Sequence, residues 1–357
     1  MLHKILRALS RINHARISQR KAKKIQAELR SIKASCSNTF PKKIKRVLII
    51  DPLVCFGDSL FINGLLHCVS SHNIEIGIFT FSKLNQIYST VIPKERIFNF
   101  ENPLDISAAL SEPWDIAIDL CYIFNQHWNE RRALIENISC YTICCDLTIQ
   151  RYGNHIYSDF LDLSSSHHFG DRMATIAKLI LDTEIPRILP YAGKRNSAPP
   201  ENNYVYINTV GGASFRCLNS HQINTITKIL SKNKVHAILY CPEKVDIDEH
   251  HYITQVSPKN FDECIGYIFN SIGVITPDTS VVHVAAAYNK PTLAFYCEND
   301  PEHYGLQMQE VWAPLCTKKI IVKPDAKGVH RIPITEITIK QIETSTTSFL
   351  KNCLRLA

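Results

Sequence analysis

Between residues 45 and 181 the chain alternates short apolar runs with longer stretches in which apolar residues recur at helical spacing. The apolar runs have the length of buried strands and are bounded by turn residues. A helix is predicted to start at Ser59, with Leu60, Leu65 and Leu66 on its inner face. Strands are predicted at residues 45–51, 74–79, 97–100, 115–120 and 141–145. Strands that open repeatedly into a loop and a helix indicate a parallel, doubly wound α/β sheet.

The same rhythm restarts in the second half of the chain. Residues 167–181 look helical, and residues 182–203 are rich in Pro, Asn, Ser and Gly, which predicts a linker between two domains. Further elements are then predicted as strands at 204–208, 235–240 and 252–256 and helices near 245–251, 261–269 and 339–354. The last of these helices is a candidate for crossing back onto the first domain. The chain is therefore expected to fold as two similar α/β halves.

Residues 273–296 form the most regular unit of the second half. A buried strand at 273–276 is followed by the polar turn Pro277-Asp278-Thr279-Ser280, a helix from Val281 to about Tyr288, and a strand at 292–296. Thr and Ser at the start of a helix expose backbone N–H groups at its positive dipole end. Such a helix start, just past the carboxyl end of a strand, is where α/β proteins bind phosphates.

The first 40 residues have a different pattern. Leu2, Ile5 and Leu9 recur at helical spacing around many Lys and Arg, which predicts a basic amphipathic helix. Such a helix is suited to an anionic membrane surface. A solvated helix packed on the body, a partly disordered arm and contact with RNA or another polyanion are the alternatives.

Charge and composition narrow the class of protein. Residues 1–46 hold 14 Lys and Arg and one acid, so the remaining 311 residues carry −6 of the overall +7. A mildly acidic body argues against a nucleic-acid-binding face there. No apolar run approaches the roughly 20 residues that span a bilayer, and a secretory signal is not expected. The 13 Cys are scattered and odd in number, which favours a reducing cytoplasm.

The unit at 273–296 resembles the signature of glycosyltransferase family 9, the heptosyltransferases of the bacterial lipopolysaccharide core. The matching residues are Asp278-Thr279-Ser280, with Ser where the family usually has Gly, then His283, Ala285-Ala286-Ala287 and Lys290-Pro291. The resemblance implies a GT-B fold, in which two Rossmann-like domains face a central cleft. Its expected parts are a basic helix at 1–40, an acceptor domain at 41–185, a nucleotide-sugar donor domain at 186–335 and a final helix at 336–357.

Gly57-Asp58, after the first strand, matches a Gly-Asp of the family. The resemblance implies that Asp58 is the general base, since an attacking sugar hydroxyl must lose its proton. Asp58 could instead only cap the helix at Ser59. Asp51, at the end of the first strand, is then the competing carboxylate.

The loop at 208–216 follows the first strand of the second domain. Its adjacent glycines allow a phosphate to approach the backbone, and its hydroxyl groups can donate hydrogen bonds. By resemblance, Arg216 matches a family Lys or Arg that pairs with the donor diphosphate. The donor-binding candidates in this loop are Thr209, Gly211, Gly212, Ser214 and Arg216.

Three acidic residues follow the strand at 235–240. Family members often have an acid at the position of Glu243 that contacts the nucleotide ribose, although a surface glutamate is the simpler interpretation. Asp246 and Asp248 superficially match a metal-binding Asp-x-Asp, but their polar surroundings favour a solvated helix face. The resemblance implies catalysis without a metal, in which Arg and helix dipoles take the place of a cation.

On the signature helix, Asp278, Thr279 and Ser280 are expected to bind or orient the donor. His283 lies one turn along the same face, where it either contacts the donor or holds the turn. His167 and His168 are predicted to be surface or linker residues.

By this resemblance the chain is expected to be an inverting, metal-independent glycosyltransferase with no cofactor. It would move heptose from ADP-heptose to a lipid-linked lipopolysaccharide core acceptor. The expected location is the cytoplasm, peripheral on the inner face of the bacterial inner membrane, without nucleic acid as a partner. A UDP-sugar donor for surface glycan synthesis and a non-catalytic nucleotide-sugar-binding protein are the alternatives.

Overall fold

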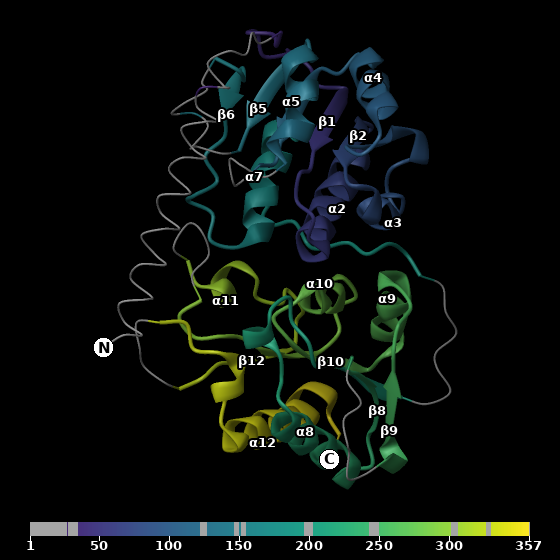
Figure 1. Ribbon diagram of the computed structural model, residues 1–357, viewed down its shortest axis with the longest axis vertical. Helices are drawn as coiled ribbons and strands as arrows, with labels where there is room; N and C mark the ends of the chain where they lie inside the picture. The colour runs from purple at the N-terminus through teal and green to yellow at the C-terminus, as the bar shows by residue number, and fades with distance from the viewer. Residues whose placement is uncertain are drawn as a thin grey trace. The chain divides into compact units, whose positions relative to one another are not determined.

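The chain divides into two compact units, each with its own sheet (Figure 1). The computed structural model describes residues 27, 35–121, 127–145, 150, 155–195, 203–242, 250–300, 306–325 and 330–356. The first unit comprises Met1–Val54, Ser70–Asn85 and Ile92–Leu163, and the second comprises Cys55–Val69, Gln86–Val91 and Ser164–Ala357. The basic helix predicted at 1–40 lies almost entirely outside the described residues.

In the first unit, the described residues form a six-stranded parallel sheet in the order β3-β2-β1-β4-β5-β6. The order reverses between β1 and β4, which is the hallmark of a doubly wound sheet. The strands are β1 (Arg46–Ile50), β2 (Glu75–Thr80), β3 (Ile97–Asn99), β4 (Ile116–Asp119), β5 (Tyr141–Cys144) and β6 (Asp159–Phe160). The helices and 3-10 turns of this unit include η1 (Ser82–Leu84), η2 (Lys94–Arg96), α4 (Pro103–Ser111) and α5 (Trp128–Asn137). The short helix α3 (Asn85–Tyr88) belongs to the second unit from Gln86 onward.

A buried ionic network closes the end of β4 in this unit. Asp119 pairs with Arg131 of α5 and accepts a 2.5 Å hydrogen bond from the Tyr157 hydroxyl. All three side chains are buried. Because a buried charge needs a partner, removing either ionic member is expected to destabilise the unit strongly.

The second sheet is also parallel, with six strands among the described residues in the order β12-β11-β10-β7-β8-β9. Its order reverses between β7 and β10. The strands are β7 (Tyr204–Asn208), β8 (His236–Tyr240), β9 (Ile253–Val256), β10 (Gly273–Pro277), β11 (Thr292–Phe295) and β12 (Lys319–Val322). The helices and turns are α2 (Phe56–Ser70), α7 (Phe169–Leu181), η3 (Ser214–Arg216), α8 (Ser220–Lys232), η4 (His250–Tyr252), α9 (Phe261–Asn270), α10 (Ser280–Ala287), α11 (Met308–Val311), η5 (Ile334–Glu336), α12 (Ile339–Ser348) and the π-helical turn η6 (Phe349–Leu354).

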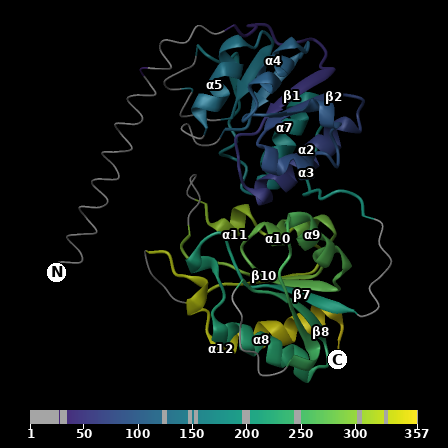
Figure 2. The ribbon, with the colours of Figure 1, turned by 45° about the vertical axis from the view of Figure 1, so that its right-hand side comes forward.

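Helices cover both faces of the second sheet, with α8 and α12 on one face and α9, α10 and α11 on the other (Figure 2). Alternate residues of its strands pack on these two layers. Val205, Ile207 and Leu239 face one way and join the core that includes Ile226 of α8 and Ile342 of α12. On the other face, Tyr206 reaches Cys264 of α9, and Ala294 and Tyr296 pack on Val282 of α10. This period-2 alternation is why strands buried on both faces read as continuous apolar runs.

The expectation of two doubly wound α/β halves is confirmed, with two differences in detail. The first helix starts at Phe56, not at Ser59, because the Phe56 ring stacks on Phe261 at 4.3 Å. Asp58 therefore lies in the first turn of α2 and is not its N-cap. In addition, the predicted last helix divides into α12 and the π-helical turn η6, which bury Ile342 and Phe349 in the core of the second unit.

Candidate functional site

The candidate site forms where the second sheet reverses its strand order. In a doubly wound sheet, ligands bind beyond the carboxyl ends of the two strands at this switch point, here β7 and β10. The amide of Asn208, the last residue of β7, donates 2.9–3.0 Å hydrogen bonds to Thr276 Oγ1 on β10 and to the Val210 carbonyl. Asn208 therefore fixes the loop after β7 against the strand that leads into α10.

The turn after β10 presents the start of α10 as an anion site. Thr279 is the N-cap, and its hydroxyl oxygen accepts the Val281 N–H at 3.1 Å. The first N–H groups of a helix have no acceptor within the helix, and its dipole is positive at this end. Thr279 and Ser280 are both half-buried, so their polar atoms remain accessible to a ligand.

Arg216 links the two loops of the switch point. Its Nη1 lies 3.2 Å from Oδ2 of Asp278, and its Nη2 lies 2.8 Å from Oδ2 of Asp300. Both carboxylates are almost fully buried, whereas 21% of the arginine side chain is exposed. The guanidinium is thus held at the base of α10 by two acids and keeps one solvent-facing side.

Gly211 allows Arg216 to take this position. A Cβ on Gly211 would lie 2.5 Å from Cβ of Arg216, whereas a Cβ on Gly212 would meet nothing within 4 Å. The first glycine is needed for close packing against the arginine. The second leaves open space over the loop.

Replacing Gly211 by Ala is expected to displace Arg216 and to weaken nucleotide binding by about tenfold or more, since charge-assisted hydrogen bonds contribute about 1.5–3 kcal/mol. Gly266→Ala in α9 is the control, because a Cβ there would meet only Nη1 of Arg195, at 3.6 Å, and this variant should bind nucleotide as the parent does. Titration calorimetry with ADP measures both variants. Equal affinities for the two would show that the packing of Gly211 on Arg216 is irrelevant to binding.

Burial raises the pKa of Asp278 to about 6, although Arg216 opposes the shift. Because the folded pKa lies above the unfolded value, the contribution of this group to stability is complete below about pH 4 and is lost as the pH rises through 6. Asp278→Asn removes the titration. Between pH 4 and pH 7, the unfolding free energy of the parent relative to this variant should fall by about 2–3 kcal/mol. A difference that stays constant with pH in urea titrations would contradict this assignment.

The other predicted residues of the loop at 208–216 occupy different positions. The Thr209 hydroxyl is buried and donates to the Tyr240 carbonyl at 3.1 Å, so it ties the loop to β8. Ser214, the first residue of η3, is exposed. Glu243, together with Asp246 and Asp248, lies outside the described residues.

His283 lies on the buried side of α10 and is only 3% exposed. Its ring packs edge-on against Phe61 of α2 at 5.0 Å and lies near Trp312 at 5.5 Å. Burial lowers the pKa of His283 to about 3, so the ring is neutral at physiological pH. Within the described part of the chain its Nδ1 is buried and has no hydrogen-bond partner.

The start of α2 lies against α10, within the second unit. A Cβ on Gly57 would lie 3.1 Å from Cδ2 of His283 and 3.7 Å from Cα of Ser280. Glycine at this position therefore allows the two helix starts to approach closely. Asp58, the next residue, is half-buried and follows this contact directly.

Asp51, the competing carboxylate, already has a structural role in the first unit. It is fully buried, and its two oxygens accept hydrogen bonds from the Leu53 N–H at 2.9 Å and from the Thr80 hydroxyl at 3.2 Å. A carboxylate with both oxygens engaged is poorly suited to accept a substrate proton. Asp51 is therefore disfavoured as the base, and Asp58 stays the base that the family resemblance implies.

The prediction that His168 is a surface or linker residue is wrong, whereas His167 is exposed. His168 is buried and caps α7, where its Nδ1 accepts the Gly170 N–H and its Nε2 lies 3.0 Å from the Ala313 carbonyl. Because Nδ1 is the acceptor, Nε2 must carry the proton. No local pattern marks this role, because Ala313 lies 145 residues away along the chain.

Two functional candidates were missed from the sequence. Asp300, beyond β11, shares Arg216 with Asp278, and Arg331, beyond β12, pairs with Asp300 at 2.5 Å. Asp300 is an acid that follows a buried strand, and this position in the sequence could have marked it as a candidate. No local pattern marks Arg331.

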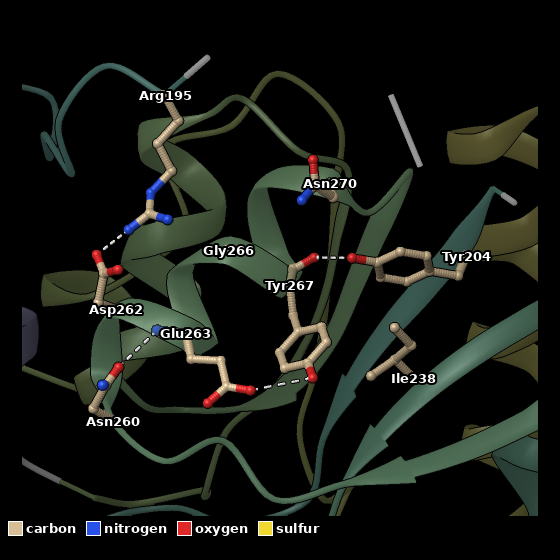
Figure 3. A pocket seen from close by; sticks show the side chains of 9 residues that line it. All are labelled: Arg195, Tyr204, Ile238, Asn260, Asp262, Glu263, Gly266, Tyr267 and Asn270. Carbon is tan, nitrogen blue, oxygen red and sulfur yellow. Dashed lines mark hydrogen bonds and ion pairs between the residues drawn. The ribbon is translucent and has the colours of Figure 1, made fainter. Parts of the chain in front are cut away.

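A second concavity, of about 500 Å³, lies beside α9 (Figure 3). Its polar groups are paired with one another: Arg195 with Asp262, Tyr267 with Glu263, and the Tyr204 hydroxyl with the Tyr267 carbonyl. With two carboxylates and one guanidinium, this pocket does not favour an anion. The lining residues are Arg195, Tyr204, Ile238, Asn260, Asp262, Glu263, Gly266, Tyr267 and Asn270.

In the described ranges, no group of three or more His, Cys, Asp and Glu residues is arranged to hold a metal ion. Independence from metals stays a prediction. A search of the same residues also finds no helix long and apolar enough to cross a membrane.

Comparison with known proteins points to one family. The model of glycosyltransferase family 9 (heptosyltransferase) matches residues 225–327. A candidate lipopolysaccharide heptosyltransferase 4 of Escherichia coli strain K12 is 40% identical over 74 residues, or 20% of this chain. The match spans only 17% of the length of that relative.

Solved structures resemble almost the whole chain. Heptosyltransferase WaaC of E. coli with ADP aligns with a TM-score of 0.67 at 13% identity, covering 85% of this chain and 99% of WaaC. The ADP-heptose lipopolysaccharide heptosyltransferase II of E. coli gives 0.65 at 14% identity, covering 85% and 98%. At such identities the likeness shows the fold, which is the two-sheet GT-B fold of these enzymes.

Proposed function

We propose that the chain is a member of glycosyltransferase family 9 that transfers heptose from ADP-heptose to a lipopolysaccharide core acceptor. The match of the family model to residues 225–327 supports this proposal. The observation that supports this most is the position of Arg216. It lies beside the start of α10 at the switch point, within 3.2 Å of Asp278. A guanidinium beside the positive end of a helix forms a site for a diphosphate.

The proposed reaction inverts the anomeric centre. The acceptor hydroxyl oxygen bonds to the anomeric carbon, the bond from that carbon to the phosphate oxygen breaks, and the nucleoside diphosphate leaves with the electron pair. Asp58 takes the hydroxyl proton. Arg216 and the N–H groups at Thr279 and Ser280 stabilise the charge that develops on the leaving diphosphate.

The roles of the two halves follow from this scheme. Residues 186–335 are proposed to bind the donor and residues 41–185 the acceptor. Glu243 is proposed to contact the ribose, and Thr209, Gly211, Gly212 and Ser214 to shape the phosphate loop. His283, being neutral and buried, is proposed to hold the start of α10 and the donor sugar.

The proposed acceptor is lipid-linked, which suits a peripheral enzyme on the inner face of the inner membrane. Residues 1–46 carry +13, and anionic lipids attract such a segment by about 1 kcal/mol per nearby cation. Cosedimentation of the full chain with vesicles containing phosphatidylglycerol, but not with purely zwitterionic vesicles, would support this location.

Incubation with ADP-heptose and a truncated core acceptor tests the proposal. We expect release of ADP and a mass gain of one heptose on the acceptor. Turnover with a UDP-sugar alone would show that the donor is a different one. Tight binding of nucleotide sugars without turnover on any acceptor would favour a non-catalytic binding protein instead.

A further inference from the structure

A second arginine lies beside Arg216, and one acid joins the two. Asp300 is 1% exposed, and its two oxygens are divided between the arginines. Its Oδ2 lies 2.8 Å from Nη2 of Arg216, and its Oδ1 lies 2.5 Å from Nε of Arg331. The Phe215 ring also lies against both guanidinium groups. Its centroid is 4.3 Å from Cζ of Arg331 and 5.6 Å from Cζ of Arg216.

The backbone holds this arrangement in place. Glu298 and Ile332 form an antiparallel bridge, with reciprocal N–H to carbonyl hydrogen bonds of 3.1 and 2.8 Å. The bridge joins the segment after β11, which carries Asp300, to the segment after β12, which carries Arg331. These main-chain hydrogen bonds lie within two residues of both Asp300 and Arg331, and they therefore hold the acid and the arginine in place.

Arg331 retains unused hydrogen-bonding capacity. A guanidinium has five N–H donors, and the structure pairs only Nε of Arg331 with Asp300 among the described residues. The side chain is 44% exposed, so its terminal nitrogens can reach a ligand. On Arg216, Nε is buried and has no hydrogen-bond partner in the described part of the chain.

We propose that Arg331 is a second diphosphate-binding residue and that Asp300 is the positioning residue that holds it beside Arg216. The two guanidinium groups would donate hydrogen bonds to the sugar-side phosphate of a nucleoside diphosphate. This inference rests on the proposed donor site. The cluster joins two arginines to two acids, Asp278 and Asp300, so its selectivity for a diphosphate must come from geometry rather than from a large positive charge.

Calorimetry with ADP and AMP tests the role of Arg331, since AMP lacks the sugar-side phosphate. Arg331→Gln is expected to weaken ADP binding by about tenfold to hundredfold and to leave AMP binding within about twofold. The matched control is Arg187→Gln, because Arg187 is also 44% exposed and paired with one acid, Asp171. That variant should bind both nucleotides as the parent does.

The Asp300→Asn variant distinguishes a positioning role of Asp300 from mere neutralisation of the charge on the two arginines. If Asp300 only neutralised its arginines, this variant would gain positive charge and bind ADP more tightly. Because Asp300 is proposed to position both, we expect weaker ADP binding and a smaller ratio of ADP to AMP affinity. Tighter ADP binding would overturn the positioning role.

The outcomes also separate this inference from the proposed function. ADP binding that depends on Arg331, without any heptose transfer, would support the inference and contradict the transferase. Unchanged ADP affinity in Arg331→Gln, or equal losses for ADP and AMP, would overturn the inference even if transfer occurs. Failure of the parent to bind ADP, UDP or pyrophosphate would overturn both.

Discussion

Replacing Asp58 by Asn is expected to lower kcat by about 10²–10⁴-fold, the usual contribution of a general base. The substitution keeps the size of the side chain but removes its ability to accept a proton. Since Asp58 is not proposed to contact the diphosphate, ADP affinity should stay within about twofold of the parent. Steady-state kinetics and calorimetry on the same preparation measure both effects.

The chain supplies a matched control for this experiment. Helices α2 and α7 both start with Phe-Gly-Asp, at Phe56-Gly57-Asp58 and Phe169-Gly170-Asp171. Asp171 occupies the same helical position and pairs with Arg187 at 2.5 Å. Asp171→Asn should change kcat little, because a partly exposed ion pair contributes only about 0–1 kcal/mol. Equal kcat values for the Asp58 and Asp171 variants would remove Asp58 as the base.

Replacing Arg216 by Ala is expected to affect both stability and binding. The variant leaves Asp278 and Asp300 buried without their shared partner, and loss of one member of a buried pair costs about 3–5 kcal/mol. Loss of its charge-assisted hydrogen bonds should weaken ADP binding by about a hundredfold. Urea unfolding and calorimetry measure the two losses.

Arg216→Lys distinguishes charge from geometry in the same position. Lysine keeps the positive charge but cannot bridge two carboxylates with a planar fork. We expect intermediate stability and intermediate ADP affinity. If Arg216→Ala bound ADP as tightly as the parent, the diphosphate would have to bind elsewhere.

Much of this architecture could be predicted because it depends on local patterns. Buried parallel strands are continuous apolar runs, and the carboxyl ends of such strands place their following loops at one edge of the sheet. Arg216 and Asp278 both follow such strands, and the resemblance to the family singled them out there. The strand β12 (Lys319–Val322) was missed because it is a short, largely exposed edge strand with a weak apolar signal.

The remaining features depend on contacts between distant segments. The early start of α2 follows from stacking of Phe56 on Phe261, and the buried state of His168 follows from the Ala313 carbonyl. Arg331 approaches Arg216 only because the Glu298–Ile332 bridge brings two loops together. Such tertiary pairings have no periodic pattern in the sequence.

The most direct test of the donor site is a crystal structure of the chain with ADP linked to 2-deoxy-2-fluoroheptose. The diphosphate is predicted to lie within hydrogen-bonding distance of the Ser280 N–H and of the Arg216 guanidinium. Density for the nucleotide in the pocket of Tyr204 and Tyr267, with the start of α10 unoccupied, would contradict it.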